Sequence, residues 1–240
     1  MQFWINHWGI SLVMGVSLSA GVLADGSVVD KVYHPYVEQL EWELEWRAVQ
    51  AYNAPPSVEA RQSTHRVGLG RAVSEFLFAE AYLIGREGSD SAFSVDAWEL
   101  EALWQLSEQG EFLLDYGVLF ELEKYRHEEI WEYATTLLLE RELGRFSATA
   151  NLSVIYEWGD DIEDEFETAA AWQARYRHSP LLEPALELYL GEDTRALGPM
   201  LQGVARLGSR QALRWEAGVV WGLDTTTADY TLRGVLEYEF

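Results

Sequence analysis

The feature that most constrains this chain is a strict alternation of apolar and polar residues along most of its length. In residues 40–48, apolar side chains at every second position alternate with three glutamates and an arginine. A period of two sends neighbouring side chains to opposite faces of a strand, whereas a helix needs a period near 3.6. The pattern recurs between turn-forming residues. It predicts twelve strands, over 37–49, 62–72, 75–85, 94–106, 111–124, 129–142, 145–158, 167–177, 182–190, 197–207, 212–223 and 230–240.

Strands of this kind can pack in two ways, and the tryptophans distinguish between them. A soluble sandwich buries its apolar face, whereas a transmembrane barrel turns that face to lipid and its polar face inward. The chain has 11 Trp, and all those after residue 24 fall on the apolar face, mostly near strand ends. Such rings are typical of the two bilayer interfaces. We therefore predict an all-β, transmembrane, up-and-down antiparallel barrel of about twelve strands, with lipid-interface anchors Trp42, Trp46, Trp98, Trp104, Trp131, Trp158, Trp172, Trp215 and Trp221.

Composition excludes several other classes of protein. The chain has 40 Asp and Glu against 17 Lys and Arg, a formal net charge of −23. Nucleic-acid binders hold phosphates with clustered cations, so we expect no nucleic-acid partner. Because the chain has 0 Cys, disulfide scaffolds, thiolate metal sites and cysteine nucleophiles are excluded.

Residues 1–24 have the pattern of a secretory signal peptide. They contain no Asp, Glu, Lys or Arg, and their apolar run ends at Val22-Leu23-Ala24, a small-x-small cleavage pattern. The absence of Lys and Arg before the apolar run departs from that pattern. A single membrane anchor is the alternative, but the run is short for the ~20 residues that a spanning helix needs. We predict a signal peptide over 1–24 and an outer-membrane β-barrel over 25–240.

Two resemblances concern the location of the barrel. The last residues alternate aromatic and acidic side chains, and Tyr238 and Phe240 resemble the C-terminal signature that the barrel-assembly machinery of outer membranes reads. The chain also resembles a group of poorly characterised proteobacterial outer-membrane barrels of porin or transporter type, through residues 30–37, 78–82, 144–146, 149–152 and 218–223. The resemblance implies export to the outer membrane of a Gram-negative bacterium. It implies outer-membrane lipid, lipopolysaccharide and the assembly machinery as partners, and no established activity.

The polar faces of the predicted strands define the interior of the barrel. A barrel of twelve strands is wider than an eight-stranded one filled by side chains, so it has room for a narrow aqueous path. An excess of carboxylate concentrates cations and repels anions. We therefore predict a small, cation-preferring channel for passive solute passage. Its acidic wall is predicted to contain Glu80, Glu101, Asp115, Glu121, Glu132 and Glu187, and its basic wall Arg175, Arg206 and Arg214.

Three alternatives stay open on the sequence alone. Interior carboxylates and arginines could pair and fill the lumen, which would leave a closed structural barrel. Ser63 and His65 share one face near a strand end and are the candidate pair for a hydrolase site at the rim. The acidic residues 159–165 could collect calcium or magnesium, but they lack EF-hand spacing and fit a solvated loop better. We expect no enzyme activity, no catalytic residue, no cofactor and no metal site.

Overall fold

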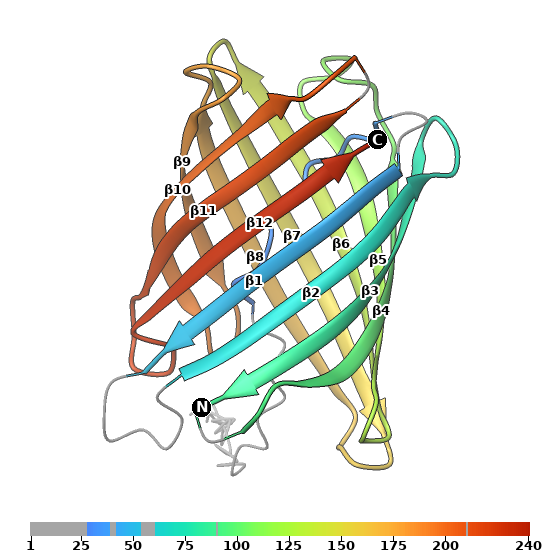
Figure 1. Cartoon of the computed structure of the whole chain (residues 1–240), viewed down its shortest axis with the longest axis vertical. Helices are drawn as coiled ribbons and strands as arrows, with labels where there is room; N and C mark the ends of the chain where they lie inside the picture. Colours follow the sequence, from blue (N-terminus) through green and yellow to red (C-terminus); the bar gives the residue numbers. More distant parts are fainter. Residues whose placement is uncertain (1–27, 39–41, 54–60, 90, 210) are drawn as a thin grey trace, which may run out of the picture.

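The structure is a computed structural model that describes residues 28–38, 42–53, 61–89, 91–209 and 211–240. The predicted signal peptide lies outside the described residues. Strands β1 to β12 pair with their neighbours in chain order and form a closed antiparallel barrel (Figure 1). They are β1 Trp42–Tyr52, β2 Arg61–Ala72, β3 Leu77–Gly88, β4 Ser94–Gln105, β5 Asp115–Tyr125, β6 Ile130–Leu143, β7 Phe146–Gly159, β8 Glu165–Tyr176, β9 Glu183–Leu190, β10 Arg195–Arg206, β11 Ala212–Gly222 and β12 Tyr230–Glu239. In the described part of the chain, no helix is long and apolar enough to cross a membrane.

The first and last strands close the barrel. β1 pairs with β12 over ten residues, from Glu43 opposite Glu239 to Tyr52 opposite Tyr230. At the end of this ladder, Trp42 and Phe240 exchange two backbone hydrogen bonds of 3.0 and 2.9 Å. The prediction of an up-and-down antiparallel barrel of twelve strands is confirmed. A closed sheet has no unpaired edge strand, as a membrane requires of a spanning sheet.

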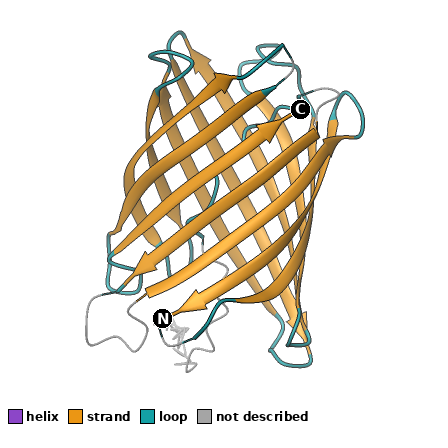
Figure 2. Ribbon diagram, viewed as in Figure 1, coloured by secondary structure: helices purple, strands orange, loops and turns teal. Residues whose placement is uncertain are grey.

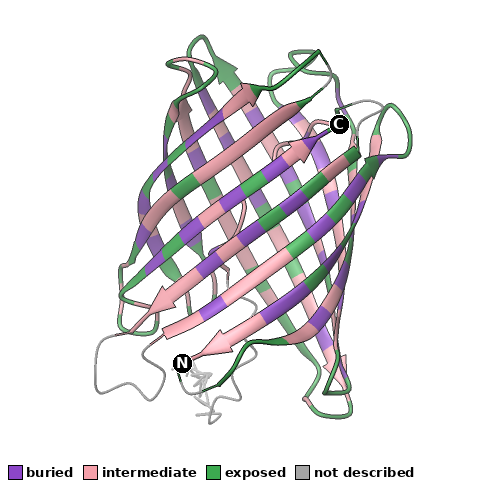
Figure 3. Cartoon of the chain, in the orientation of Figure 1, coloured by how far each residue is buried: buried purple, intermediate pink, exposed green. Residues whose placement is uncertain are grey.

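The alternation in the sequence is the alternation between the two faces of the wall. Along β1, the outward Leu44 and Trp46 are 47% and 43% exposed, whereas the inward Glu45 and Arg47 are 0% and 1% exposed. Figure 3 shows the same change as bands of buried and exposed residues along the strands. The barrel therefore has an apolar outer face and a polar, largely buried interior.

The two rims of the barrel are built from turns and loops that join neighbouring strands (Figure 2). We call the rim that carries Trp42 and Phe240 the C-terminal end and the opposite rim the far end. At the C-terminal end, Gly144 and Arg145 join β6 to β7, and Gly144 has a φ of 66°. Positive φ is easy for glycine and is needed by the two-residue turns that match the twist of a hairpin.

The predicted start of the first strand was wrong. The alternation indicated a strand from residue 37, but β1 begins at Trp42, and Val37 and Glu38 are not in a strand. Residues 28–38, which we call the inner segment, run inside the barrel instead (Figure 1). Their side chains are held by partners around the wall, which a strand with one lipid-facing side could not reach.

Candidate channel interior

The inner segment passes through the lumen from one end to the other. At the far end, Val28 lies against Gly191 in the connection between β9 and β10. At the C-terminal end, the Tyr36 hydroxyl donates to Asp115 Oδ2 at 2.8 Å, and Arg214 donates to Glu38 at 3.1 Å. Ten peptide units can cover about 33 Å when extended, which is enough to cross a membrane-spanning barrel. The segment is therefore a plug made by the chain itself.

One side of the inner segment packs against β9, β10 and β11. Val29 and Val32 are buried in a small apolar cluster with Tyr189, Ala196 and Val220. Burial of a valine side chain contributes about 1.5–3 kcal/mol. This cluster is a rare apolar patch in the interior and fixes the segment to one side of the lumen.

Charged contacts hold the same stretch of the segment. Arg47 Nη1 donates to Asp30 Oδ2 at 2.6 Å, and Arg66 Nη1 lies 3.5 Å from the same oxygen. Two guanidinium groups therefore lie against one carboxyl group inside the barrel.

Lys31 places an ammonium group among carboxylates of the wall. Its Nζ lies 2.7 Å from Glu45 Oε2 and also pairs with Glu237. Oxygens of Glu43, Glu45 and Glu237 lie within 4.8 Å of one another, the spacing of a metal site. The position that a bound metal cation would need is thus filled by the chain.

Further along, the segment crosses to the opposite wall and narrows the lumen. The Tyr33 hydroxyl donates to Glu101 Oε1 at 2.8 Å, and His34 Nδ1 pairs with Glu140. Gly117 of β5 lies beneath Pro35, where a Cβ would come within 3.2 Å of the Pro35 Cβ. Residues 33–36 therefore form the constriction nearest the C-terminal end.

On the other side of the lumen, five adjacent strands carry glutamates at directly paired positions. From β4 to β8, the register joins Glu99 to Glu123, Glu123 to Glu132, Glu132 to Glu157 and Glu157 to Glu165. Paired positions share one face of the sheet, and neighbouring strands lie about 4.8 Å apart. We call this set the glutamate row. Like charges directly opposite one another destabilise a sheet, so the row favours cations beside it.

The protein supplies cations to one end of the glutamate row. Arg66 lies 2.8 Å from Glu99 and 3.8 Å from Glu123, and Arg86 lies 3.3 Å from Glu123. Within the described residues, no ion pair involves the three other members, Glu132, Glu157 and Glu165. Within the described residues, the row therefore has cationic partners at β4 and β5 and none at β6, β7 and β8.

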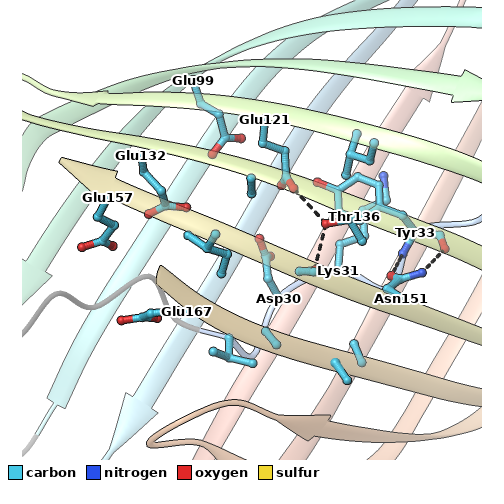
Figure 4. A pocket seen from close by; sticks show the side chains of 18 of the residues that line it. Asp30, Lys31, Tyr33, Glu99, Glu121, Glu132, Thr136, Asn151, Glu157 and Glu167 are labelled. Carbon is cyan, nitrogen blue, oxygen red and sulfur yellow. Dashed lines mark hydrogen bonds between the residues drawn. The ribbon is translucent and has the colours of Figure 1, made fainter. Parts of the chain in front are cut away.

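A cavity of about 110 Å³ lies between the inner segment and β4 to β8 (Figure 4). We call it the acidic cavity. Figure 4 shows labelled glutamates of β4 to β8 around the same space. Glu99 is 3% exposed, and its Oε1 has no hydrogen-bond partner within the described residues. The acidic lining consists of Asp30, Glu99, Glu121, Glu132, Glu157 and Glu167.

The structure places all six residues of the predicted acidic wall on the inner face, but not in one group. Glu121 and Glu132 line the acidic cavity. Glu187 pairs with Arg233 of β12 at 3.0 Å. The remaining three are buried in the interior and lie towards the C-terminal end: Glu80, Glu101 and Asp115.

The interior cations differ from the sequence-based expectation. Arg175 lies 3.4 Å from Glu183, and Arg214 pairs with Glu239. Arg206 is exposed at the end of β10 and forms no ion pair within the described residues. Sequence reasoning missed Arg47 and Arg66, which both lie against the Asp30 carboxylate of the inner segment. Both arginines fall on the inward face in the alternation, and this was the signal that could have identified them.

The nine tryptophans of the predicted interface lie on the outer face of the wall. Trp98 contacts Trp131 edge-on at 5.7 Å, and Trp131 stacks on Trp158 at 6.3 Å between ring centroids. These three neighbours form an aromatic band close to the far end. At the C-terminal end, Tyr238 stacks on Phe240 at 5.5 Å. The six remaining tryptophans of the predicted interface also lie on the outer face: Trp42, Trp46, Trp104, Trp172, Trp215 and Trp221.

The candidate hydrolase pair does not form. Ser63 Oγ accepts a hydrogen bond from Gln50 Nε2 at 2.8 Å, and His65 stacks on Trp46 with 6.1 Å between ring centroids. No hydrogen bond joins Ser63 to His65, although both residues are described. The geometry therefore gives no activated nucleophile at this position.

The barrel is similar to solved outer-membrane channels. It matches the COG4313 outer membrane channel from Pseudomonas putida F1 with a TM-score of 0.59 and 13% identity, over 88% of this chain and 100% of that one. It matches the KdgM porin with a TM-score of 0.54 and 10% identity, over 82% of this chain and 99% of that one. No family model and no curated protein matches the sequence. At these identities the likeness shows the fold.

Proposed function

We propose that this protein is an outer-membrane channel for the passive passage of small cations, narrowed by its own inner segment. The uncompensated part of the glutamate row carries the proposal. Glu132 and Glu157 face the lumen at paired positions without a cationic partner in the described part of the chain. Such a wall raises the local concentration of cations and repels anions.

The distribution of space inside the barrel supports a channel over a closed structural barrel. The inner segment and its ion pairs occupy the side formed by β1, β2, β9 and β12. The acidic cavity occupies the other side and reaches from Thr136 in mid-strand to Glu157 and Glu167 near the far end. A path along β4 to β8 needs a local movement of residues 33–36 rather than an unfolding of the wall.

The outer face supports a membrane location. Leucines and aromatic rings there are broadly exposed, as in Leu83 at 60% and Trp104 at 50%. Exposed apolar surface on this scale is costly in water and favourable in lipid. We propose lipid and lipopolysaccharide as the surroundings of this face, and the assembly machinery as the partner that folds it.

The test is ion selectivity of protein expressed from the full chain, purified from membranes and inserted in planar bilayers. In a KCl gradient we expect discrete steps of small conductance and a cation-selective reversal potential. The double variant Glu121→Gln with Glu132→Gln should move that potential towards zero. The matched control is Glu108→Gln with Glu111→Gln, which removes the same charge from an exposed loop.

Two results would overturn the proposal. The first is anion selectivity of the wild-type protein. The second is absence of conductance in both the wild-type protein and a variant in which the inner segment has lost its anchor at Lys31.

A further inference from the structure

Within the described residues, the acidic cavity has more carboxyl groups than cationic partners. Of its two lining cations, Arg66 pairs with Glu99, and Lys31 pairs with Glu45 and Glu237, which lie outside the cavity. Four lining carboxylates take part in no ion pair within the described residues: Glu121, Glu132, Glu157 and Glu167. We propose that this cavity binds alkyl diammonium ions, short aliphatic chains with an ammonium group at each end. The inference rests on the proposed function, because it names the class of cation that the channel admits.

The spacing of the carboxylates favours two separate positive charges over one metal ion. A calcium ion needs several oxygens at 2.3–2.6 Å, and therefore close to one another. Within the described residues, a group of three such ligands within 4.8 Å occurs at Glu43, Glu45 and Glu237, not in this cavity. In the cavity, Glu132 and Glu157 are one strand apart, and Glu121 and Glu167 lie on strands at its two sides. Charges spread along a row suit a ligand whose own charges are spread.

The surface between the carboxylates is apolar and suits an alkyl chain. Leu119, Ala134, Ile155 and the alanines 169–171 line the same cavity. The cavity volume of about 110 Å³ limits the ligand to a short chain. Glu99 also lines the cavity, and its buried Oε1 has no hydrogen-bond partner in the described residues, whereas its Oε2 pairs with Arg66.

Lys31 shows how the interior of the barrel binds an ammonium group on an alkyl chain. Its ammonium, at the end of an alkyl chain, lies between Glu45 and Glu237. A free diammonium ion would place the same group, on the same kind of chain, among the carboxylates of β5 to β8. The proposed ligand thus repeats a contact that the protein already makes with its own side chain.

The test is equilibrium dialysis of radiolabelled 1,4-diaminobutane against the purified protein in detergent at fixed ionic strength. We expect saturable binding of one molecule per barrel, weakened at least tenfold by Glu132→Gln with Glu157→Gln. The control Glu108→Gln with Glu111→Gln should bind as the wild type does. If the double variant does not fold, Glu167→Gln alone serves, with a smaller loss of binding expected. n-Butylamine, with one charge, should compete at least tenfold more weakly than the diamine.

Three results would overturn the inference: no saturable binding, equal competition by n-butylamine, or unchanged binding in the folded cavity variants. Failure of the inference and failure of the proposed function are distinguishable. Cation-selective conductance without diamine binding removes the inference and leaves the channel. Diamine binding without conductance removes the channel and leaves the binding site.

Discussion

The side chain of Asn151 forms two hydrogen bonds with the backbone of Tyr33 in the inner segment. The Tyr33 N–H donates to Asn151 Oδ1 at 2.8 Å, and Asn151 Nδ2 donates to the Tyr33 carbonyl at 2.9 Å. A side-chain amide of β7 thus replaces the neighbouring strand that Tyr33 lacks. Both bonds are partly buried, so their loss leaves two partly buried backbone groups without this partner.

Asn151→Ala should therefore loosen the constriction without damaging the wall. Leaving a buried polar group unsatisfied costs about 1–3 kcal/mol, which favours displacement of residues 33–36. We expect larger or more frequent openings in single-channel records of this variant. Ser153→Ala is the control, because Ser153 lies two residues along β7 and its Oγ bonds to Thr136, not to the segment. Records that do not differ between the two variants would show that this pair does not hold the constriction.

Lys31→Met should release the anchor of the segment on β1 and β12. Removing one partner of a buried ion pair costs about 3–5 kcal/mol because it leaves the other charges unpaired. The Lys31 side chain is 15% exposed, and its removal leaves two carboxylates unpaired. We therefore expect a free-energy cost near the lower end of this range. Limited proteolysis should cut the segment faster in this variant, and conductance should rise. Lys31→Arg keeps the charge and should restore protection. Equal cleavage rates in all three proteins would count against the anchor.

Leu100 and Glu101 test which face of the wall meets lipid. They are adjacent in β4, and Leu100 is 48% exposed whereas Glu101 is 6% exposed. An arginine on the lipid face near mid-bilayer costs about 2–4 kcal/mol, so Leu100→Arg should lower the yield of folded barrel in lipid vesicles. Glu101→Gln, in the lumen, should fold as the wild type does. The yields are compared by heat-dependent mobility on gels, and equal yields would contradict the assigned faces.

The strands were predictable because each wall residue meets one of two environments. Trp104 and Glu101 differ in position by an odd number and lie on opposite faces, as the period of two requires. The inner segment was not predictable in this way. Asp30, Lys31 and Tyr33 contact partners on different strands around the lumen, so no period marks them. The predicted strand extended back to Val37, beyond Leu40, where the regular alternation of β1 begins.

The sequence predicted which residues of the candidate site carry a charge, but not which of them form ion pairs. The alternation identified Glu121 and Glu132 as inward carboxylates, but their lack of cationic partners depends on the register between strands. That register follows from turn geometry and from closure of the barrel, which a single sequence does not specify. The role of Arg66, which neutralises Glu99, likewise depends on two strands that are not adjacent in the barrel.

Acid should release the inner segment through Asp30. Asp30 Oδ2 accepts a hydrogen bond from Arg47 Nη1 at 2.6 Å and lies 3.5 Å from Arg66 Nη1. Protonation of Asp30 removes the negative charge that both guanidinium groups contact, and so weakens the seating of the inner segment. We therefore expect conductance to rise in acid as Asp30 takes up a proton. Asp30→Asn removes this carboxylate but leaves Arg47 paired with Glu45 at 2.7 Å. The channel of this variant should open more often at neutral pH, and its conductance should rise less in acid. Because other carboxylates titrate in the same range, the measured quantity is the difference between the two proteins at each pH, at constant ionic strength. A difference that does not change between pH 5 and pH 2.5 would show that Asp30 does not seat the segment.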